Sequence, residues 1–294
     1  MSLSGKTVFL TGGSRGIGLA IAKRFAQDGA NIIIAAKTVE PHPKLGGTIH
    51  TAAAEIEELG GQALPVQTDI RYEEQIAEAI KQGVERFHGI DIVINNASAI
   101  YLLSPEILKM KQYDLMFSVN ARGSYMTNSL CFEYLKKSDN PHIITLSPPI
   151  NMKMEWFKSN MAYTQSKFMM SMNTVGFASV FKKYGIAVNS LWPKTVIDTD
   201  AIRHINPDLV RYSRKDTIMA DAAYWIANQK AKKYTGRFFI DQEVLEKTGV
   251  EDFTKYAVSP GNTLIRDLFI GHPNDAMKML DVHGKEIDPY EDDV

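Results

Sequence analysis

The feature that most constrains the fold is a glycine-rich turn between two apolar runs near the N-terminus. Residues 7–10 form a short apolar run, which leads directly into Thr11-Gly-Gly-Ser-Arg-Gly-Ile-Gly18. Apolar residues at near-helical spacing follow as far as Asp28-Gly29, and residues 31–36 form a second apolar run. A strand, a glycine turn, a helix and a second strand within about 30 residues are typical of a βαβ unit. Such a unit belongs to a parallel sheet.

The glycines of this turn have the spacing G-x-x-x-G-x-G, at Gly12, Gly16 and Gly18. Because glycine has no Cβ, the backbone can approach a pyrophosphate closely, and the helix that follows offers free N–H groups to an anion. A turn that serves only helix–strand packing could carry the same glycines, but the two flanking strands favour nucleotide binding. We therefore expect the turn to bind a dinucleotide through Gly12, Ser14, Arg15, Gly16, Ile17 and Gly18.

Apolar runs and helical patterns alternate along most of the remaining chain. Strands are expected at residues 63–68, 90–94, 142–146, 187–191 and 237–240, and helices at 51–59, 73–87, 113–135 and 163 to about 184. This alternation predicts an α/β fold, a single Rossmann-like doubly wound domain whose parallel sheet of about seven strands carries helices on both faces. We expect that domain to span residues 1–294, with a lid at about 195–216 and an extension at about 244–294.

Polar residues follow several of the expected strands. Gly12, Asp69, Asn95, Ser147 and Pro193 all stand at strand ends. Because ligands of such sheets bind at the carboxyl ends of the strands, we expect these residues to converge around one site.

A tyrosine and a lysine four residues apart, Tyr163 and Lys167, share one face of an expected helix. A free tyrosine has a pKa of about 10, and a fixed positive charge nearby favours the phenolate and lowers that pKa. The pair could therefore transfer a proton. An aromatic core residue beside a solvated lysine would show the same spacing, so the other motifs must decide between the two interpretations.

The motifs together resemble the short-chain dehydrogenase/reductase family over about residues 6–241. They are Thr11-Gly-x-x-x-Gly-x-Gly18, Asn95-Asn-Ala97, Asn120 in Ser-Val-Asn-Ala-Arg-Gly, Ser147 after a strand, and Tyr163-x-x-x-Lys167. Segments 35–50, 147–149 and 191–195 look more specifically like the family's hydroxysteroid dehydrogenase-like protein 2 group. Members of that group often carry a sterol-carrier domain after the reductase domain, and we expect none within these 294 residues.

The resemblance implies roles for four residues. Tyr163 would be the general acid/base that exchanges a proton with the substrate oxygen, and Lys167 would lower its pKa and hydrogen-bond the nicotinamide ribose. Ser147 would hold the same substrate oxygen, although it precedes Tyr163 by 16 residues, a longer interval than is common in the family. Asn120 would anchor a water that links Lys167 to solvent, or would instead satisfy backbone groups in a kinked helix.

The resemblance also implies further contacts to the cofactor. Asn95 and Ala97 would line the adenosine ribose. Asp69 would contact adenine, but could equally be the N-cap of the next helix. Pro193 and Thr195 would lie near the nicotinamide. Because Lys194 stands where most members have glycine, Thr199 is an alternative to Thr195.

The charges after the second expected strand bear on the choice of cofactor. A preference for NAD usually shows as an acidic residue there, whereas this chain has Ala36 and then Lys37, with Arg15 in the neighbouring turn. Two cations suit the 2′-phosphate of NADP(H). We expect NADP(H) to be preferred over NAD(H), and no metal.

Methionines and aromatic residues cluster around the expected site. Met152, Met154, Met161, Met169, Met170 and Met172 lie near Trp156 and Phe157. They could form an adaptable pocket for a small lipophilic carbonyl or alcohol such as a steroid or fatty-acyl chain, or could pack a helix core or a subunit contact. The resemblance implies a homo-oligomer, a dimer or tetramer.

Bulk properties narrow the remaining choices. The net charge of -1 gives no footprint for nucleic acid, and no apolar run reaches the length of a membrane span. One cysteine, Cys131, excludes an internal disulfide and suits a reducing compartment. We expect a soluble intracellular protein, cytoplasmic by default, although an organelle is not excluded.

These observations lead to a main functional prediction and two alternatives. The main one is an NADP(H)-dependent oxidoreductase that moves a hydride between nicotinamide and a secondary alcohol or ketone. A catalytically silent nucleotide-binding protein with a regulatory or scaffolding role is the first alternative. A lipid-binding module is the second, and only the methionine cluster favours it.

Overall fold

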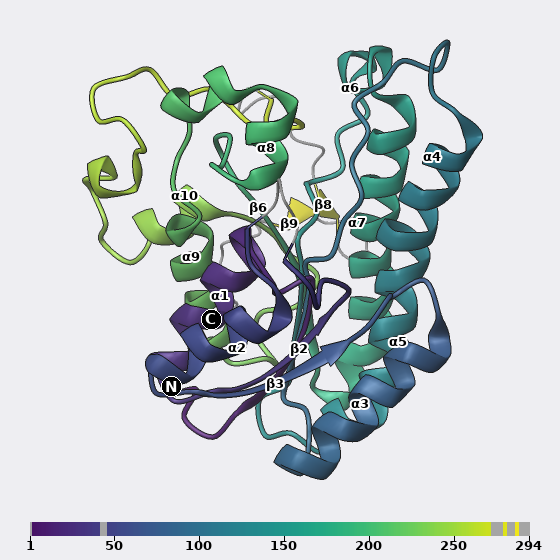
Figure 1. Cartoon of the computed structure of the whole chain (residues 1–294), viewed down its shortest axis with the longest axis vertical. Coiled ribbons are helices and arrows are strands. Elements are labelled where there is room, and N and C mark those ends of the chain that lie inside the picture. Colours follow the sequence, from purple (N-terminus) through teal and green to yellow (C-terminus); the bar gives the residue numbers. More distant parts are fainter. Residues whose placement is uncertain (1, 42–45, 272–278, 281–285, 288–294) are drawn as a thin grey trace.

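The computed structural model describes residues 2–41, 46–271, 279–280 and 286–287 (Figure 1). Its centre is a seven-stranded parallel sheet in the order β3-β2-β1-β4-β5-β6-β7. The strands are β1 (Thr7–Thr11), β2 (Asn31–Ala36), β3 (Gln62–Gln67), β4 (Ile92–Asn95), β5 (His142–Thr145), β6 (Ala187–Trp192) and β7 (Phe238–Ile240). The predicted α/β fold with a doubly wound parallel sheet is confirmed.

Helices cover both faces of the sheet (Figure 1). One layer contains α1 (Gly16–Ala26), α2 (Ile49–Glu58), α9 (Thr217–Ala227) and α10 (Asp241–Glu246), and the other contains α3 (Glu73–Phe87), α5 (Ser124–Leu135) and α7 (Met161–Phe181). Alternate residues of β2 enter the two cores, with Ile32 and Ile34 on one side and Ile33 and Ala35 on the other. A strand that is buried on both faces has a continuous apolar sequence, and for this reason β2 could be predicted from the sequence.

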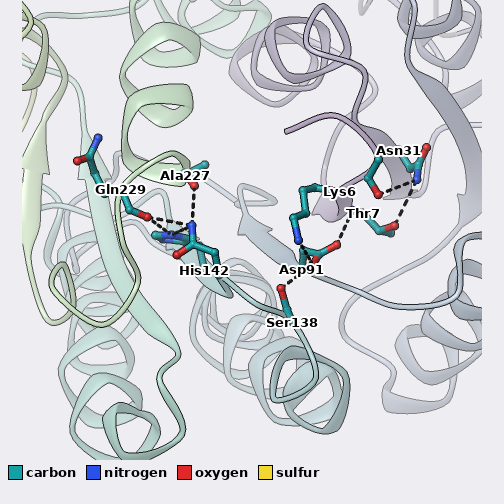
Figure 2. Close-up of polar contacts among 10 residues, drawn as sticks. Lys6, Thr7, Asn31, Asp91, Ser138, His142, Ala227 and Gln229 are labelled. Atoms are coloured by element: carbon teal, nitrogen blue, oxygen red, sulfur yellow. Dashed lines mark hydrogen bonds and ion pairs between the residues drawn. The ribbon is translucent and has the colours of Figure 1, made fainter. Parts of the chain in front are cut away.

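Polar contacts fasten the amino-terminal ends of the strands (Figure 2). Asp91 accepts hydrogen bonds from the Thr7 N–H (2.9 Å) and the Ser138 hydroxyl (2.5 Å), and pairs with Lys6 at 3.2 Å. His142 is buried, and its Nε2 lies 3.0 Å from the carbonyl oxygen of Gln229. Burial lowers the pKa of His142 to about 4. These contacts lie at the opposite end of the sheet from the glycine turn, and they hold the strands in register.

The helix expected at residues 113–135 is interrupted. It consists of α4 (Met110–Met116), a π-helical turn η1 (Phe117–Gly123) and α5. Asn120 lies within the π-helical turn, where its amide Oδ1 accepts from the Ala99 N–H (2.7 Å) and its Nδ2 donates to the Ala99 carbonyl (2.9 Å). A single helix over this span is therefore wrong, because the widened turn is anchored by side-chain contacts distant in sequence.

Three shorter segments surround the carboxyl ends of the strands. The expected lid contains α8 (Asp200–Ile205) and a 3-10 segment, η3 (Pro207–Tyr212), and α6 (Met154–Lys158) lies at the same end of the molecule (Figure 1). Residues 265–270, which we call the strap, return across this end. The Val196 N–H donates to the Ile265 carbonyl (2.9 Å), and the Ile265 N–H donates to Tyr212 (3.0 Å).

The remaining elements lie outside the central sheet. They are η2 (Lys182–Tyr184), η4 (Thr254–Tyr256), and the antiparallel pair β8 (Met279–Leu280) and β9 (Glu286–Ile287). Apart from β9, the acidic tail at residues 281–294 falls outside the described residues. Within the described ranges, no helix has both the length and the apolar composition that crossing a bilayer requires.

Candidate active site

A cavity of about 780 Å³ opens at the carboxyl ends of the strands. Its walls come from the segments that follow β1 to β6, from the lid and from the strap. The residues predicted for the site that line it are Gly12, Ser14, Arg15, Gly16, Ile17, Lys37, Asp69, Ala97, Tyr163, Lys167 and Pro193. The cavity therefore collects most of the predicted residues from distant parts of the sequence.

The glycine turn has the geometry of an anion cradle. Gly12 has a φ of +72°, and a Cβ there would stand 2.8 Å from the Cα of Ala97. Gly18 lies outside the cavity wall, and a Cβ on it would meet the Gly12 carbonyl oxygen at 2.6 Å. Gly12 thus permits the close approach of the turn to the backbone of Ala97, and Gly18 permits close packing of the helix against the turn.

Two cations, Arg15 and Lys37, line the cavity near β1 and β2, and each lies close to a carboxylate. Arg15 lies 3.9 Å from Asp200, which also lines the cavity. Arg15 donates to the backbone carbonyls of Gly46 (2.7 Å) and Gly47 (3.0 Å). Lys37 lies 4.0 Å from Asp69, which also accepts a 2.6 Å hydrogen bond from the Arg71 guanidinium. Burial alone would raise the pKa of Asp69, but the hydrogen bonds from Arg71 and the charge of Lys37 hold it below its usual value.

Asp69 is not a helix N-cap. α3 begins at Glu73, and the residue before it, Tyr72, occupies the N-cap position without a side-chain cap. The N-cap interpretation of Asp69 is therefore wrong, because the Asp69 carboxylate is held by Arg71 instead. Its place on the cavity wall is compatible with contact to a nucleobase.

Asn95 and Asn96 have different surroundings. Asn95 is buried, and its Nδ2 donates to Asn128 (2.7 Å) and Thr145 (3.3 Å). The structure places Asn96 on the cavity wall and leaves Asn95 behind it. The Asn96 Nδ2 donates to the Gly12 carbonyl at 2.8 Å. Sequence reasoning missed Asn96, although it stands one residue beyond the strand end.

Tyr163 and Lys167 lie together on the cavity wall, in the first turns of α7. The Lys167 ammonium donates to the Leu146 carbonyl (2.5 Å) and lies 5.0 Å from the centre of the Trp192 ring. Burial lowers the pKa of Lys167 to about 7. Burial also raises the pKa of Tyr163, and the charge of Asp267 raises it further.

The raised Tyr163 pKa contradicts the expectation that Lys167 lowers it. Tyr163 is only 6% exposed and Lys167 only 2%, and the loss of hydration is the largest influence on the Tyr163 pKa. In this arrangement Tyr163 retains its proton at neutral pH.

Ser147 is not brought to the cavity with Tyr163. Its hydroxyl lies 2.9 Å from the Ser190 hydroxyl, which in turn donates to Thr174 at 2.8 Å, all within the buried interior. Among the described residues that line the cavity, Leu146 is present and Ser147 is absent. Two features of the sequence are associated with the position of Ser147 outside the cavity wall: the long interval to Tyr163 and the two prolines that follow Ser147.

Asn120 connects the π-helical turn to the start of α7. Besides its bonds to Ala99, its Nδ2 donates to the Ser166 hydroxyl (3.0 Å), and that hydroxyl donates to the Tyr163 carbonyl (2.8 Å). The amide therefore satisfies backbone groups and positions the turn that carries Tyr163, in agreement with the structural interpretation of this residue.

The two threonines considered for the nicotinamide side also differ. Thr195 lies away from the cavity wall, and its buried hydroxyl has no hydrogen-bond partner among the described residues. Thr199 lines the cavity, where its hydroxyl caps α8 by accepting from the Ile202 N–H at 3.4 Å. Pro193 lies on the wall as expected.

The apolar wall does not come from the methionine cluster. Met152 and Met154 are 65% and 87% exposed, and no methionine of the cluster lines the described cavity. Aliphatic residues of the lid, the strap, α4 and the segment that follows β4 form that wall instead, namely Ile100, Leu102, Leu115, Ile202, Ile205, Leu209, Ile265 and Leu268. The methionine pocket is therefore wrong, whereas an apolar wall is present.

The strap supplies site residues that sequence reasoning missed. Asp267 lines the cavity, and the ring of Phe269 packs 6.3 Å from that of Tyr163. Burial raises the pKa of Asp267 to about 7. The only signal in the sequence was the charged pair Arg266-Asp267 inside the otherwise apolar stretch Leu264-Ile-Arg-Asp-Leu-Phe-Ile270.

Comparisons with known proteins show the family to which the chain is similar. The sequence profile of the short chain dehydrogenase family matches residues 6–209. The chain is 53% identical to hydroxysteroid dehydrogenase-like protein 2 of Danio rerio, and the match covers 96% of this chain and 68% of that protein. A crystal structure from Xanthomonas campestris is 48% identical with a TM-score of 0.90, covering 92% of this chain and 100% of that one. A short chain dehydrogenase homologue from Mycobacterium thermoresistibile is 47% identical with a TM-score of 0.88, covering 92% and 97%.

Proposed function

The chain belongs to the short-chain dehydrogenase/reductase family of NAD(P)-dependent oxidoreductases, and we propose that it interconverts a lipophilic ketone and secondary alcohol with NADP(H). The observation that supports this most is the shared cavity: the glycine turn, Tyr163 and Lys167 line one continuous wall. A cofactor bound at the turn would therefore extend toward a proton donor.

The residues on the wall fit a dinucleotide. The glycine turn lies on the cavity wall at the start of α1, where the first N–H groups of the helix would bind a pyrophosphate, and Asp69 and Ala97 would face the adenosine. Arg15 and Lys37 carry the positive charge that a 2′-phosphate requires, which favours NADP(H) over NAD(H). When bound, the cofactor supplies or accepts the hydride.

The protein's own groups handle the proton. Tyr163 keeps its proton because of burial, so its phenol can donate to a carbonyl oxygen as that oxygen gains charge during reduction. Lys167 is held by the Leu146 carbonyl near the same wall, where its ammonium would stabilise the phenolate that remains. In the oxidation direction, the same pair would accept the proton of the alcohol.

The apolar wall supports a lipophilic substrate. Aliphatic side chains of the lid and the strap line the same cavity as Tyr163 and Lys167. A pocket lined mainly by such residues, with few polar groups, binds apolar ligands and orients them by those polar groups. The designation of the Danio rerio relative as hydroxysteroid dehydrogenase-like accords with that class.

Turnover of lipophilic ketones and aldehydes tests the proposal. NADPH consumption is followed by absorbance with a panel of steroid ketones and long-chain ketones and aldehydes. Tyr163→Phe removes one hydroxyl and is expected to reduce kcat by at least about 100-fold. The quenching or enhancement of NADPH fluorescence on binding provides the control, because both proteins should bind NADPH equally.

A different result would favour the silent nucleotide-binding alternative. Tight NADPH binding with no turnover that depends on Tyr163, on any member of the panel, would contradict the proposed reaction. The position of Ser147 outside the cavity wall is the one observation that favours this alternative.

We also propose that the chain forms a homo-oligomer, a dimer or tetramer. α7 exposes Met169, Met172 and Val180, and α5 exposes Tyr125, although both helices are otherwise well packed. Exposed apolar side chains on long helices commonly mark subunit contacts. Light scattering coupled to size-exclusion chromatography would measure the mass, and a monomer at micromolar concentration would contradict this proposal.

A further inference from the structure

The strap places a carboxyl group on the cavity wall that Tyr163 and Lys167 also line. The backbone N–H of Asp267 donates to the Lys194 carbonyl (3.2 Å), and the Asp267 carboxylate accepts from the N–H of Leu268. A carboxylate among apolar side chains is costly unless nearby groups stabilise its charge. The groups around Asp267 therefore indicate which charged residues interact with its carboxylate.

Trp192 links the strap to Lys167. The Trp192 indole N–H donates to the Leu268 carbonyl (2.8 Å), and the Lys167 ammonium lies 5.0 Å from the centre of the indole ring. Phe269 packs against Trp192 at 5.8 Å and against Tyr163 at 6.3 Å between ring centres. The same short segment thus carries Asp267, contacts Tyr163 through Phe269, and is joined to Lys167 through Trp192.

The backbone of the strap is held in an uncommon conformation. Phe269 has a φ of +71°, in the left-handed region that bulky residues rarely adopt. Such a conformation persists only where the surroundings over-determine it, and it is concentrated at functional sites. Here the packed aromatic rings and the hydrogen bonds on both sides of Asp267 fix its position.

The charges of Asp267, Lys167 and Tyr163 influence one another. Burial lowers the pKa of Lys167 to about 7, and the Asp267 charge opposes that change. The same charge adds to burial in raising the pKa of Tyr163. Burial raises the pKa of Asp267 to about 7, with Asp241 adding to the rise and Lys167 opposing it.

Other charged residues adjoin the group from neighbouring segments. Asp241 stands at the start of α10, where it accepts a hydrogen bond from the backbone N–H of Lys194 (2.8 Å). Arg266 precedes Asp267 on the strap and is exposed at the cavity wall. Asp241 does not line the described cavity, whereas Asp267 shares the cavity wall with Tyr163 and Lys167, and the charge of Asp267 acts to raise the pKa of both.

We propose that Asp267 is a positioning residue of the proton-transfer centre, whose carboxylate keeps Lys167 charged and Tyr163 protonated. The catalytic consequence rests on the proposed function, whereas the electrostatic coupling can be measured without turnover. Tyr163 and Lys167 belong to the segment that matches the family profile, and Asp267 lies beyond it. The centre would thus depend on a group from outside that segment.

Nuclear magnetic resonance of the full chain, with aspartate labelled with carbon-13 at the side-chain carboxyl, tests the coupling. A resonance that is missing from Asp267→Asn should titrate near neutral pH. Lys167→Met removes the ammonium at similar length, so the midpoint of that resonance should rise by about one pH unit. Tyr163→Phe removes only a neutral phenol and should leave the midpoint in place. An unchanged midpoint in Lys167→Met overturns the proposal.

The pH profile of kcat/KM for ketone reduction tests the consequence. In Asp267→Asn, Lys167 and Tyr163 should lose their protons more readily, so the alkaline decline in activity should move to lower pH by about one unit. Asp267→Glu should restore the profile, and Asp252→Asn, a matched loss of charge at a fully exposed site, should not alter it. A uniform loss of kcat/KM with an unmoved decline overturns the proposal. Absence of any Tyr163-dependent turnover would contradict the proposed function and leave the resonance titration to decide the coupling.

Discussion

The backbone of Gly12 approaches that of Ala97 so closely that a Cβ on Gly12 would stand 2.8 Å from the Ala97 Cα. Gly12 also has a φ of +72°, which a residue with a side chain adopts only at a cost. Gly12→Ala should therefore lower the free energy of unfolding by about 2 kcal/mol or more. Because the turn must shift, it should also weaken NADPH binding. Chemical denaturation and fluorescence titration measure the two effects.

Gly60→Ala provides the matched control. Gly60 also has a positive φ, +94°, but a Cβ there would meet nothing within 4 Å. We expect a loss of about 1 kcal/mol from backbone strain alone, with NADPH binding unchanged. Equal effects of the two substitutions on NADPH binding would contradict a specific role for the Gly12–Ala97 approach.

Lys37→Asp should reverse the preference between the two cofactors. The ammonium of Lys37 lines the cavity beyond β2, and a carboxylate at this place would repel a 2′-phosphate and accept from a ribose hydroxyl. Since a hydrogen bond to a charged group contributes roughly 1.5–3 kcal/mol, NADPH affinity should fall about ten- to hundredfold relative to NADH. Fluorescence titrations with both cofactors measure the ratio. An unchanged ratio would show that Lys37 does not contact the 2′-phosphate.

Ser147→Ala should affect stability more than catalysis. The Ser147 hydroxyl bonds to Ser190 in the interior, so its loss should cost about 1 kcal/mol of unfolding free energy. Because Ser147 is absent from the cavity wall, kcat should fall by less than about tenfold, whereas Tyr163→Phe should lower it at least about 100-fold. If a stable Ser147→Ala protein lost as much kcat as Tyr163→Phe, Ser147 would have to contact the substrate oxygen directly.

His142 should make stability depend on pH in the acid range. Its pKa is about 4 in the folded protein because of burial, against an ordinary value of about 6.5. Between these values the unfolded chain binds the extra proton, so stability should fall as the pH drops from about 6.5 to 4, by about 3 kcal/mol in total. His142→Gln should flatten that part of the profile in urea denaturation at several pH values. If the stability of both proteins changed with pH in the same way, His142 would not be the cause of the acid-range dependence.

Much of the fold was predictable because buried parallel strands leave a plain sequence signal. β2 is apolar at nearly every position because it contacts a core on each face, and the glycine turn before α1 identifies the βαβ unit. The π-helical turn at Asn120 had no such signal. It depends on hydrogen bonds between Asn120 and Ala99, which are distant contacts that no local periodicity reports.

The site was predictable where a residue type and a strand end coincide, as for Gly12 and Asp69 on the cavity wall. The direction of a side chain was less accessible to sequence reasoning. Ser147 follows its strand as expected, yet its hydroxyl bonds to Ser190 in the interior. The pKa of Tyr163 could not be read from its spacing to Lys167 either, because burial, which only the folded structure reveals, is the larger influence.

The strap also has a consequence for how the molecule acquires activity. Phe269 packs against Tyr163 across about a hundred residues of chain, and because long-range contacts form slowly, we expect the strap to dock after the sheet has assembled. During refolding, the strands and helices can therefore form before the proton-transfer centre is complete. Recovery of helical circular dichroism should precede recovery of turnover, and the delay would report the docking of one short segment against Trp192.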